Sequence, residues 1–166
     1  MLDKIDYQMG GTEKQILMIL EHIDREKYDI HLCLFRHSEW MEENPGNHKI
    51  FYFDFSSFKR ARSYIEFFKF VKYLRQHRFD VLVSFFKDSN KIAVPAAKLS
   101  GIKNIVFSRR NSNHWVTRRE EFVLKLLRPF VKSYWVNATD IKNRLVKQER
   151  VSPDKIEVIY NGIILV

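Results

Sequence analysis

Short apolar runs alternate with longer helical segments along almost the whole chain of 166 residues. The run 79–86 is nearly continuous in apolar residues, as in a strand buried on both faces, and 90–99 has the composition of a small-residue helix. Strands separated by helices of about 10 to 20 residues form parallel βαβ units with right-handed crossovers. We therefore expect a doubly wound, Rossmann-like α/β fold, with a mainly parallel sheet and helices on both faces.

The other elements follow the same alternation. Thr12 and Gln15 have the spacing of a capping box, which predicts a helix of about 12 residues after Gly10-Gly11. A first strand ending at Met1 and Leu2 is barely present. The further strands are expected at 28–35, 50–55, 79–86, 104–108, 133–137 and 156–160, and the further helices at about 58–77, 90–99, 117–129 and 140–149.

The composition is that of a folded domain. Hydrophobic residues make up 45% of the chain, with only five Gly and four Pro, which excludes wholesale disorder and collagen-like structure. The start lacks the pattern of a signal peptide, and no window of about 18 apolar residues occurs, so we expect a chain that is neither exported nor membrane-spanning. The single cysteine, Cys33, lies in an apolar run, which predicts a buried thiol and favours the reducing cytoplasm.

A net charge of +9 suggests a polyanionic partner: nucleic acid, a phosphate-bearing ligand or an anionic membrane. On the expected helix 58–77, Phe70 and Tyr73 fall on the half that also carries cations, where they would face an anionic membrane. Cover by a neighbouring loop or by another domain is the alternative. A second candidate surface runs from Trp115 to Arg128.

Ligands of such folds bind above the carboxyl edge of the sheet, so the polar residues after each strand are the candidates for a cleft. Neighbouring residues of an extended segment point in opposite directions, so at most one of Arg109 and Arg110 faces the cleft while the other forms a salt bridge or meets solvent. The candidate cleft residues are Glu13, Lys87, Asp88, Asn90, Arg109, Arg110, Asn111, His114 and Asn137.

The glycine pair and two of the candidate cleft residues have a structural alternative. Gly10 and Gly11 could let backbone N–H groups and a helix amino terminus meet an anion, or could simply allow a tight turn. His114 could be a surface residue, and Asn137 could cap a helix. No His, Cys, Asp and Glu cluster has metal-ligand spacing, and no catalytic residue can be assigned.

The chain carries three motifs at strand ends: GGTEKQ at 10–15, SRRN at 108–111 and SPDKIEVIYNGI at 152–163. Together they resemble the amino-terminal, acceptor-side domain of a GT-B-fold glycosyltransferase of family 4, over 1–163. The resemblance implies that 1–160 form this Rossmann-like domain. It also implies that 161–166, starting with Asn161 and Gly162, begin the linker to a donor-binding domain that the chain lacks.

The resemblance implies retaining, metal-independent transfer of a sugar from a nucleotide-sugar to a saccharide or lipid-linked acceptor, with Gly10 and Gly11 facing the donor phosphates. The expected setting is bacterial cell-surface polysaccharide or glycolipid biosynthesis, such as that of lipopolysaccharide, in the cytoplasm and peripherally at the inner face of the plasma membrane. The family's donor-binding residues belong to the second domain, so this chain alone is expected to be inactive. No cofactor is implied, because the nucleotide-sugar is a substrate.

The family's histidine near the end of the strand 79–86 has no counterpart, because the corresponding stretch reads Ser84-Phe85-Phe86-Lys87. A stand-alone module that binds nucleic acid or another polyanion is the alternative function. Such a module needs aromatic residues that alternate with Lys and Arg to form a surface on which bases stack. The aromatic residues of this chain fall mostly in the expected strands and helix cores instead. We therefore expect no nucleic-acid partner.

Overall fold

The computed structural model describes residues 1–2, 4–8, 10–44, 46, 48–55, 60–110 and 117–162, without the side chain of Lys87. Helices and parallel strands alternate along the chain, which confirms the predicted Rossmann-like α/β class. The chain divides into two compact units, one formed by Met1–Phe67 with the end of the chain from Gly162, the other by Phe68–Asn161. No helix within the described residues is both long enough and apolar enough to span a bilayer.

The first unit is built on a pair of parallel strands. Its elements are α1 (Gly11–His22), β1 (His31–Leu34), α2 (Glu39–Glu43), β2 (Lys49–Tyr52) and the start of α3 (Ala61–His77). The pairing places Leu34 opposite Tyr52, and Leu2 adds only an isolated bridge to Leu34, so the first strand is as short as expected. The short helix α2 was not predicted. Ser38 caps it, accepting a hydrogen bond from the backbone N–H of Met41.

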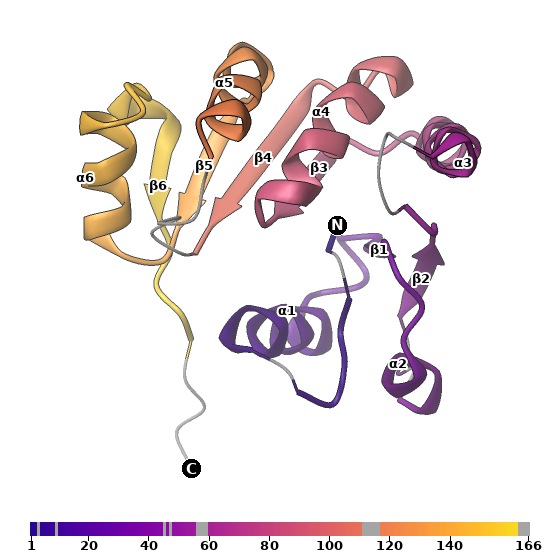
Figure 1. Cartoon of the computed structure of the whole chain (residues 1–166). Helices are drawn as coiled ribbons and strands as arrows, with labels where there is room; N and C mark the ends of the chain where they lie inside the picture. The colour runs from indigo at the N-terminus through magenta and orange to yellow at the C-terminus, as the bar shows by residue number, and fades with distance from the viewer. Residues whose placement is uncertain are drawn as a thin grey trace. The chain divides into compact units, whose positions relative to one another are not determined.

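The second unit holds a four-stranded parallel sheet in the order β3-β4-β5-β6 (Figure 1). Its elements after α3 are β3 (Val81–Phe85), α4 (Lys87–Ser100), β4 (Asn104–Arg109), α5 (Arg118–Leu127), the 3-10 turn η1 (Arg128–Phe130), β5 (Ser133–Val136), α6 (Thr139–Lys147), the 3-10 turn η2 (Pro153–Lys155) and β6 (Ile156–Val158). β4 supplies more buried apolar side chains than any other strand of the sheet, with Ile105, Val106 and Phe107 all buried.

Two helix starts differ from the prediction. α1 begins at Gly11, and its N-cap residue Gly10 offers no side-chain cap, so the predicted capping box of Thr12 is wrong. A capping box forms instead at α5, between Thr117 and Glu120. α4 begins at Lys87, three residues before the predicted start, because Phe86 makes the whole strand-to-helix turn with a positive φ of 66°.

The orientation of α3 corrects the prediction of a membrane-facing surface. Phe70 is fully buried, together with Phe67, Val71 and Leu74, so it cannot face a membrane. Tyr73 is half-buried, and its ring lies against those of His77 and Phe79 at centroid distances of 4.5 and 6.0 Å. The helix is apolar around more than half of its circumference, so the 3.6-residue period alone does not decide which half is buried.

The thiol of Cys33 is buried, as the sequence predicted. Burial raises its pKa to about 11, because the thiolate would lose its hydration. The cysteine is therefore a small apolar member of the core.

We expect Phe70→Ala to lower the free energy of unfolding by about 3 to 5 kcal/mol, because it leaves a cavity where a fully buried ring was. Phe122→Ala is the matched control: that ring on α5 is 61% exposed, so its loss should cost less than about 1 kcal/mol. Urea unfolding of both variants checks this. Equal costs would contradict the orientation of α3.

Candidate functional site

The carboxyl ends of the four parallel strands in the second unit meet at one edge of the sheet. The register pairs Phe85 with Ser108, and Ser108 with Trp135, while Val136 pairs with Val158. The residues that follow these positions therefore lie along this edge, where α/β folds bind their ligands. They include the amino terminus of α4, Arg110, Asn137 and Asn161.

Arg109 points away from this edge and forms a buried ion pair. Its side chain is 5% exposed, and its Nη2 donates to both carboxylate oxygens of Glu149 at 2.7 and 2.9 Å. Arg128 donates to the same carboxylate at 3.1 Å and also to the backbone carbonyl of Glu149. The assignment of Arg109 to the cleft is thus corrected: its charge is neutralised inside the unit by Glu149.

The same cluster affects Tyr134, whose pKa rises to about 12. Burial is the main cause, because the phenolate would be poorly hydrated there; the nearby Arg109 and Arg128 act in the opposite direction. The phenol is therefore neutral at physiological pH and is no candidate for an acid or base at the site.

Arg110, unlike Arg109, lies at the carboxyl edge of the sheet. Its Nε donates to Ser108 Oγ at 3.3 Å, and its Nη1 donates to Asn161 Oδ1 at 2.8 Å. The guanidinium carbon lies 5.8 Å from the centre of the Phe85 ring. Burial lowers the pKa of Arg110, because its half-buried charge has lost part of its hydration. We call Phe85, Ser108, Arg110 and Asn161 the Arg110 cluster.

The amino terminus of α4 brings several polar groups to the end of β3. Asn90 is completely buried, and neither polar atom of its side chain has a hydrogen-bond partner in the described part of the chain. The hydroxyls of Ser84 and Ser89 are buried in the same way. Asn90 is thus near the predicted edge but inaccessible, so a direct contact with a ligand would require movement.

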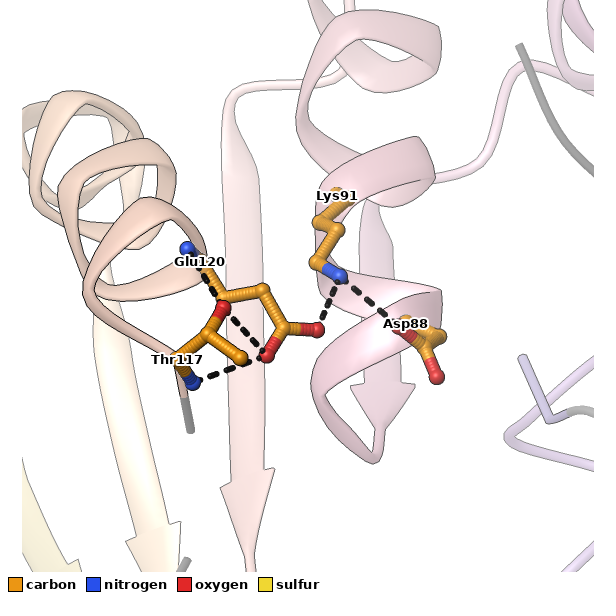
Figure 2. A network of polar contacts seen from close by, with 4 residues as sticks. All are labelled: Asp88, Lys91, Thr117 and Glu120. Atoms are coloured by element: carbon orange, nitrogen blue, oxygen red, sulfur yellow. Dashed lines mark hydrogen bonds and ion pairs between the residues drawn. The ribbon is translucent and has the colours of Figure 1, made fainter. Parts of the chain in front are cut away.

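A network of ion pairs and hydrogen bonds ties α4 to the start of α5 (Figure 2). Lys91 Nζ lies 2.8 Å from Asp88 Oδ1 and 2.9 Å from Glu120 Oε1. Burial opposes the charge of Lys91, but the bonds to both carboxylates outweigh it, and its pKa is raised. The other oxygen of Glu120 accepts from the N–H and hydroxyl of Thr117. The predicted cleft residue Asp88 is therefore the exposed end of a structural network.

Asn137 follows β5, as predicted, but it is not a helix cap. The N-cap position of α6 is Ala138, and it has no side-chain cap. The Oδ1 atom of Asn137 is buried without a hydrogen-bond partner among the described residues. Nearby, Thr139 and Tyr160 share a hydrogen bond of 3.2 Å between their hydroxyls.

The glycine pair lies in the first unit, at the amino terminus of α1. A Cβ on Gly10 would lie 2.9 Å from Glu13 Oε2, so the carboxylate of Glu13 occupies the space beside Gly10. A Cβ on Gly11 would meet nothing within 4 Å among the residues that the structure describes, apart from its own neighbours in the helix. Gly11 therefore leaves open space at a helix amino terminus, where an anion is favoured by the helix dipole. The carbonyl of the predicted linker residue Gly162 accepts a hydrogen bond of 2.7 Å from Gln15.

Four predicted residues are only partly described or not at all. Asn111 and His114 lie outside the described residues, as does Trp115 of the second candidate surface. Lys87 begins α4, but its side chain is outside the description. Within the described residues, no three His, Cys, Asp or Glu side chains come together as a metal site would require. Metal-independent chemistry therefore stays a prediction.

Sequence reasoning missed the roles of Glu149 and Asn161. Glu149 lies just after α6, where nothing in the local pattern indicates that it meets an arginine 40 positions earlier. Asn161 was assigned to a linker only. Its position directly after the predicted strand 156–160 was the available signal, because it places Asn161 at the same edge as Arg110.

Both the sequence and the fold of this chain are similar to those of known glycosyltransferases. The model of the family described as Glycosyltransferase Family 4 matches residues 9–165. HepE from Anabaena, solved in complex with UDP and glucose, is similar with a TM-score of 0.74 and 16% identity, over 98% of this chain and 44% of that one. No curated protein matches the chain significantly.

Two further solved structures are similar. The lipopolysaccharide outer core galactosyltransferase WaaB has a TM-score of 0.69 and 18% identity, over 98% of this chain and 44% of WaaB. MurG from Acinetobacter baumannii has a TM-score of 0.63 and 14% identity, over 99% of this chain and 46% of MurG. At these identities the likeness shows the fold alone. This chain spans less than half the length of each of these proteins.

We expect Glu149→Gln to lower the free energy of unfolding by about 3 kcal/mol or more, because it leaves the buried guanidinium of Arg109 without a counter-charge. Glu157→Gln is the matched control, since Glu157 is exposed on β6 and the same change should cost less than about 0.5 kcal/mol. Chemical denaturation measures both. A small cost for Glu149→Gln would mean that the ion pair does not hold the unit together.

Proposed function

Because the chain belongs to Glycosyltransferase Family 4, we propose that it is the acceptor-side domain of a retaining enzyme that transfers a sugar from a nucleotide-sugar to a saccharide or lipid-linked acceptor. The observation that carries the proposal is the family match over 9–165, which is almost the whole chain. The HepE structure, with UDP and glucose bound, supports a nucleotide-linked sugar as the donor.

The proposal divides the work between two domains. The chain is less than half as long as the similar enzymes, which leaves room in a related protein for a donor-binding domain of comparable size. In this chain, Arg110 at the carboxyl edge offers an anchor for the acceptor, and Gly11 offers an open helix amino terminus to the donor phosphates. Each of these contacts would hold its own substrate in a fixed orientation for the reaction.

We place the enzyme in cell-surface polysaccharide or glycolipid biosynthesis, such as that of lipopolysaccharide, at the cytoplasmic face of the plasma membrane. The similarity to WaaB supports this setting. On α5, the exposed side chains of Phe122 and Leu126 lie among the cations Arg118, Arg119 and Lys125, and we call these five residues the α5 surface. Aromatic and aliphatic groups among cations suit an anionic membrane interface. This surface replaces the one predicted at Phe70 and Tyr73.

The proposal that transfer needs both domains is tested by measuring acceptor-dependent release of nucleotide from a panel of UDP- and GDP-sugars. We expect none from the 166-residue chain alone, and turnover when the donor-binding domain is present in the same polypeptide. Turnover by the chain alone would contradict the two-domain proposal. So would a two-domain protein that only hydrolyses the donor, or that transfers nothing from any nucleotide-sugar.

Gly11→Ala sharpens this test, because its effects on stability and on transfer should have opposite signs. Alanine favours a helix over glycine by up to about 1 kcal/mol, and the added Cβ meets no other part of the described chain within 4 Å, so the unfolding temperature should rise. The same Cβ fills the space proposed for the donor phosphates, so the KM for the nucleotide-sugar should rise. A stabilised variant with unchanged KM would remove Gly11 from the donor site.

The α5 surface is tested by co-sedimentation with lipid vesicles. We expect binding to vesicles containing phosphatidylglycerol, no binding to pure phosphatidylcholine, and weaker binding in high salt because the attraction is electrostatic. Phe122→Ser with Leu126→Ser should abolish binding. Ile19→Ser on α1, another exposed apolar residue, should leave it unchanged. Unchanged binding by the double variant would show that α5 does not contact the membrane.

A further inference from the structure

The two adjacent arginines at the end of β4 differ in how their charges are compensated. Arg109 is paired with the carboxylate of Glu149 through two short contacts from one nitrogen. Arg110 is half-buried but, among the described residues, has no carboxylate within ion-pair distance. Its partners are a hydroxyl, an amide oxygen and an aromatic ring, all of them neutral. The described part of the chain thus leaves a half-buried positive charge at the carboxyl edge without a counter-charge.

The neutral partners also fix the guanidinium in place. Ser108 holds Nε, Asn161 holds Nη1, and Phe85 lies against the guanidinium. Ser108 and Phe85 lie at the ends of β4 and β3, and Asn161 lies three residues beyond β6, so the position of the charge depends on several strands of the sheet and not on one mobile side chain. The other N–H groups of the guanidinium remain available to donate hydrogen bonds to a ligand. A guanidinium held in this way loses little conformational entropy when it binds a ligand.

We propose that the Arg110 cluster binds a phosphate group of the acceptor, which then serves as the counter-ion of Arg110. The inference rests on the proposed function, which makes this edge the acceptor side of the enzyme. Arginine pairs with phosphate through two parallel N–H···O bonds, and such charge-assisted bonds strengthen where water is partly excluded. The ligand class is therefore a phosphorylated acceptor, such as a lipid-linked phosphate or diphosphate, and not a neutral saccharide.

Glu149 cannot take the place of this anion. Its carboxylate already accepts bonds from Arg109 and Arg128, and its backbone carbonyl accepts another from Arg128. Asp88, an acidic residue at the amino terminus of α4, is held by Lys91. Neither Glu149 nor Asp88 is therefore available as the counter-ion of Arg110.

The test introduces a counter-charge in place of the ligand. Asn161→Asp puts a carboxylate at the position of Oδ1, 2.8 Å from Nη1 of Arg110, without removing any side-chain atom that packs. Inorganic pyrophosphate is the probe, and its affinity is measured by calorimetry. We expect Asn161→Asp and Arg110→Ala each to weaken binding about tenfold or more, since the first variant gives Arg110 a carboxylate partner that competes with the anion and the second removes the positive charge.

Two control variants distinguish an effect at the Arg110 cluster from a general effect of the net charge. Asn143→Asp adds the same negative charge at an exposed position of α6, and Lys103→Ala removes one positive charge at the opposite end of β4. Both should leave the affinity for pyrophosphate within about twofold of the unmodified protein. Wild-type affinity in Asn161→Asp and Arg110→Ala would overturn the inference and leave Arg110 as a purely structural partner of Asn161. Equal losses in all four variants would overturn it as well.

A second arm separates the acceptor from the donor as the source of the phosphate. UDP and a short-chain prenyl diphosphate are compared with wild type and Asn161→Asp. A loss confined to the prenyl diphosphate supports the inference, whereas a loss confined to UDP overturns it in favour of a donor site. If pyrophosphate binding depends on Arg110 but the two-domain protein transfers no sugar, the proposed function fails while the anion site remains.

Discussion

Parallel pairing of β3, β4, β5 and β6 determines where polar chemistry can occur in the second unit. Each strand must return to the same end of the sheet before the next begins, so all four carboxyl ends share one edge. The register then sets the partners across that edge, for example Phe85 opposite Ser108. Residues as far apart in the sequence as Phe85, Arg110 and Asn161 become neighbours for this reason alone.

The alternation of side chains along an extended segment then gives adjacent residues opposite roles. Arg109 enters a buried ion pair with Glu149, and Arg110 lies at the edge among neutral groups. The buried pair compensates its own charge, so it stabilises the fold without being available to a ligand. The edge charge is less well compensated by the described chain, which makes it the more reactive of the two toward anions.

The sequence predicted the repeating pattern of elements and the buried state of Cys33, because both follow from local apolar periodicity. It failed where the outcome depends on contacts between distant segments. Phe70 was placed on the wrong side of α3, since the helix is apolar on both halves and only its neighbours decide which half is buried. At the site, the opposite directions of the two arginines were predictable, but the partners Glu149 and Asn161 were not, because sheet packing brings them there.

The network of Lys91, Asp88, Glu120 and Thr117 has a consequence for how such a domain can diverge. Lys91 is bonded to carboxylates on two helices, Asp88 on α4 and Glu120 on α5, and Glu120 in turn accepts bonds from Thr117. Residues that share one network do not act independently on stability, so the effects of substitutions at these four positions are expected to be non-additive. In a diverging domain these residues would change together, whereas exposed positions of α4 and α5 outside the network can change one at a time.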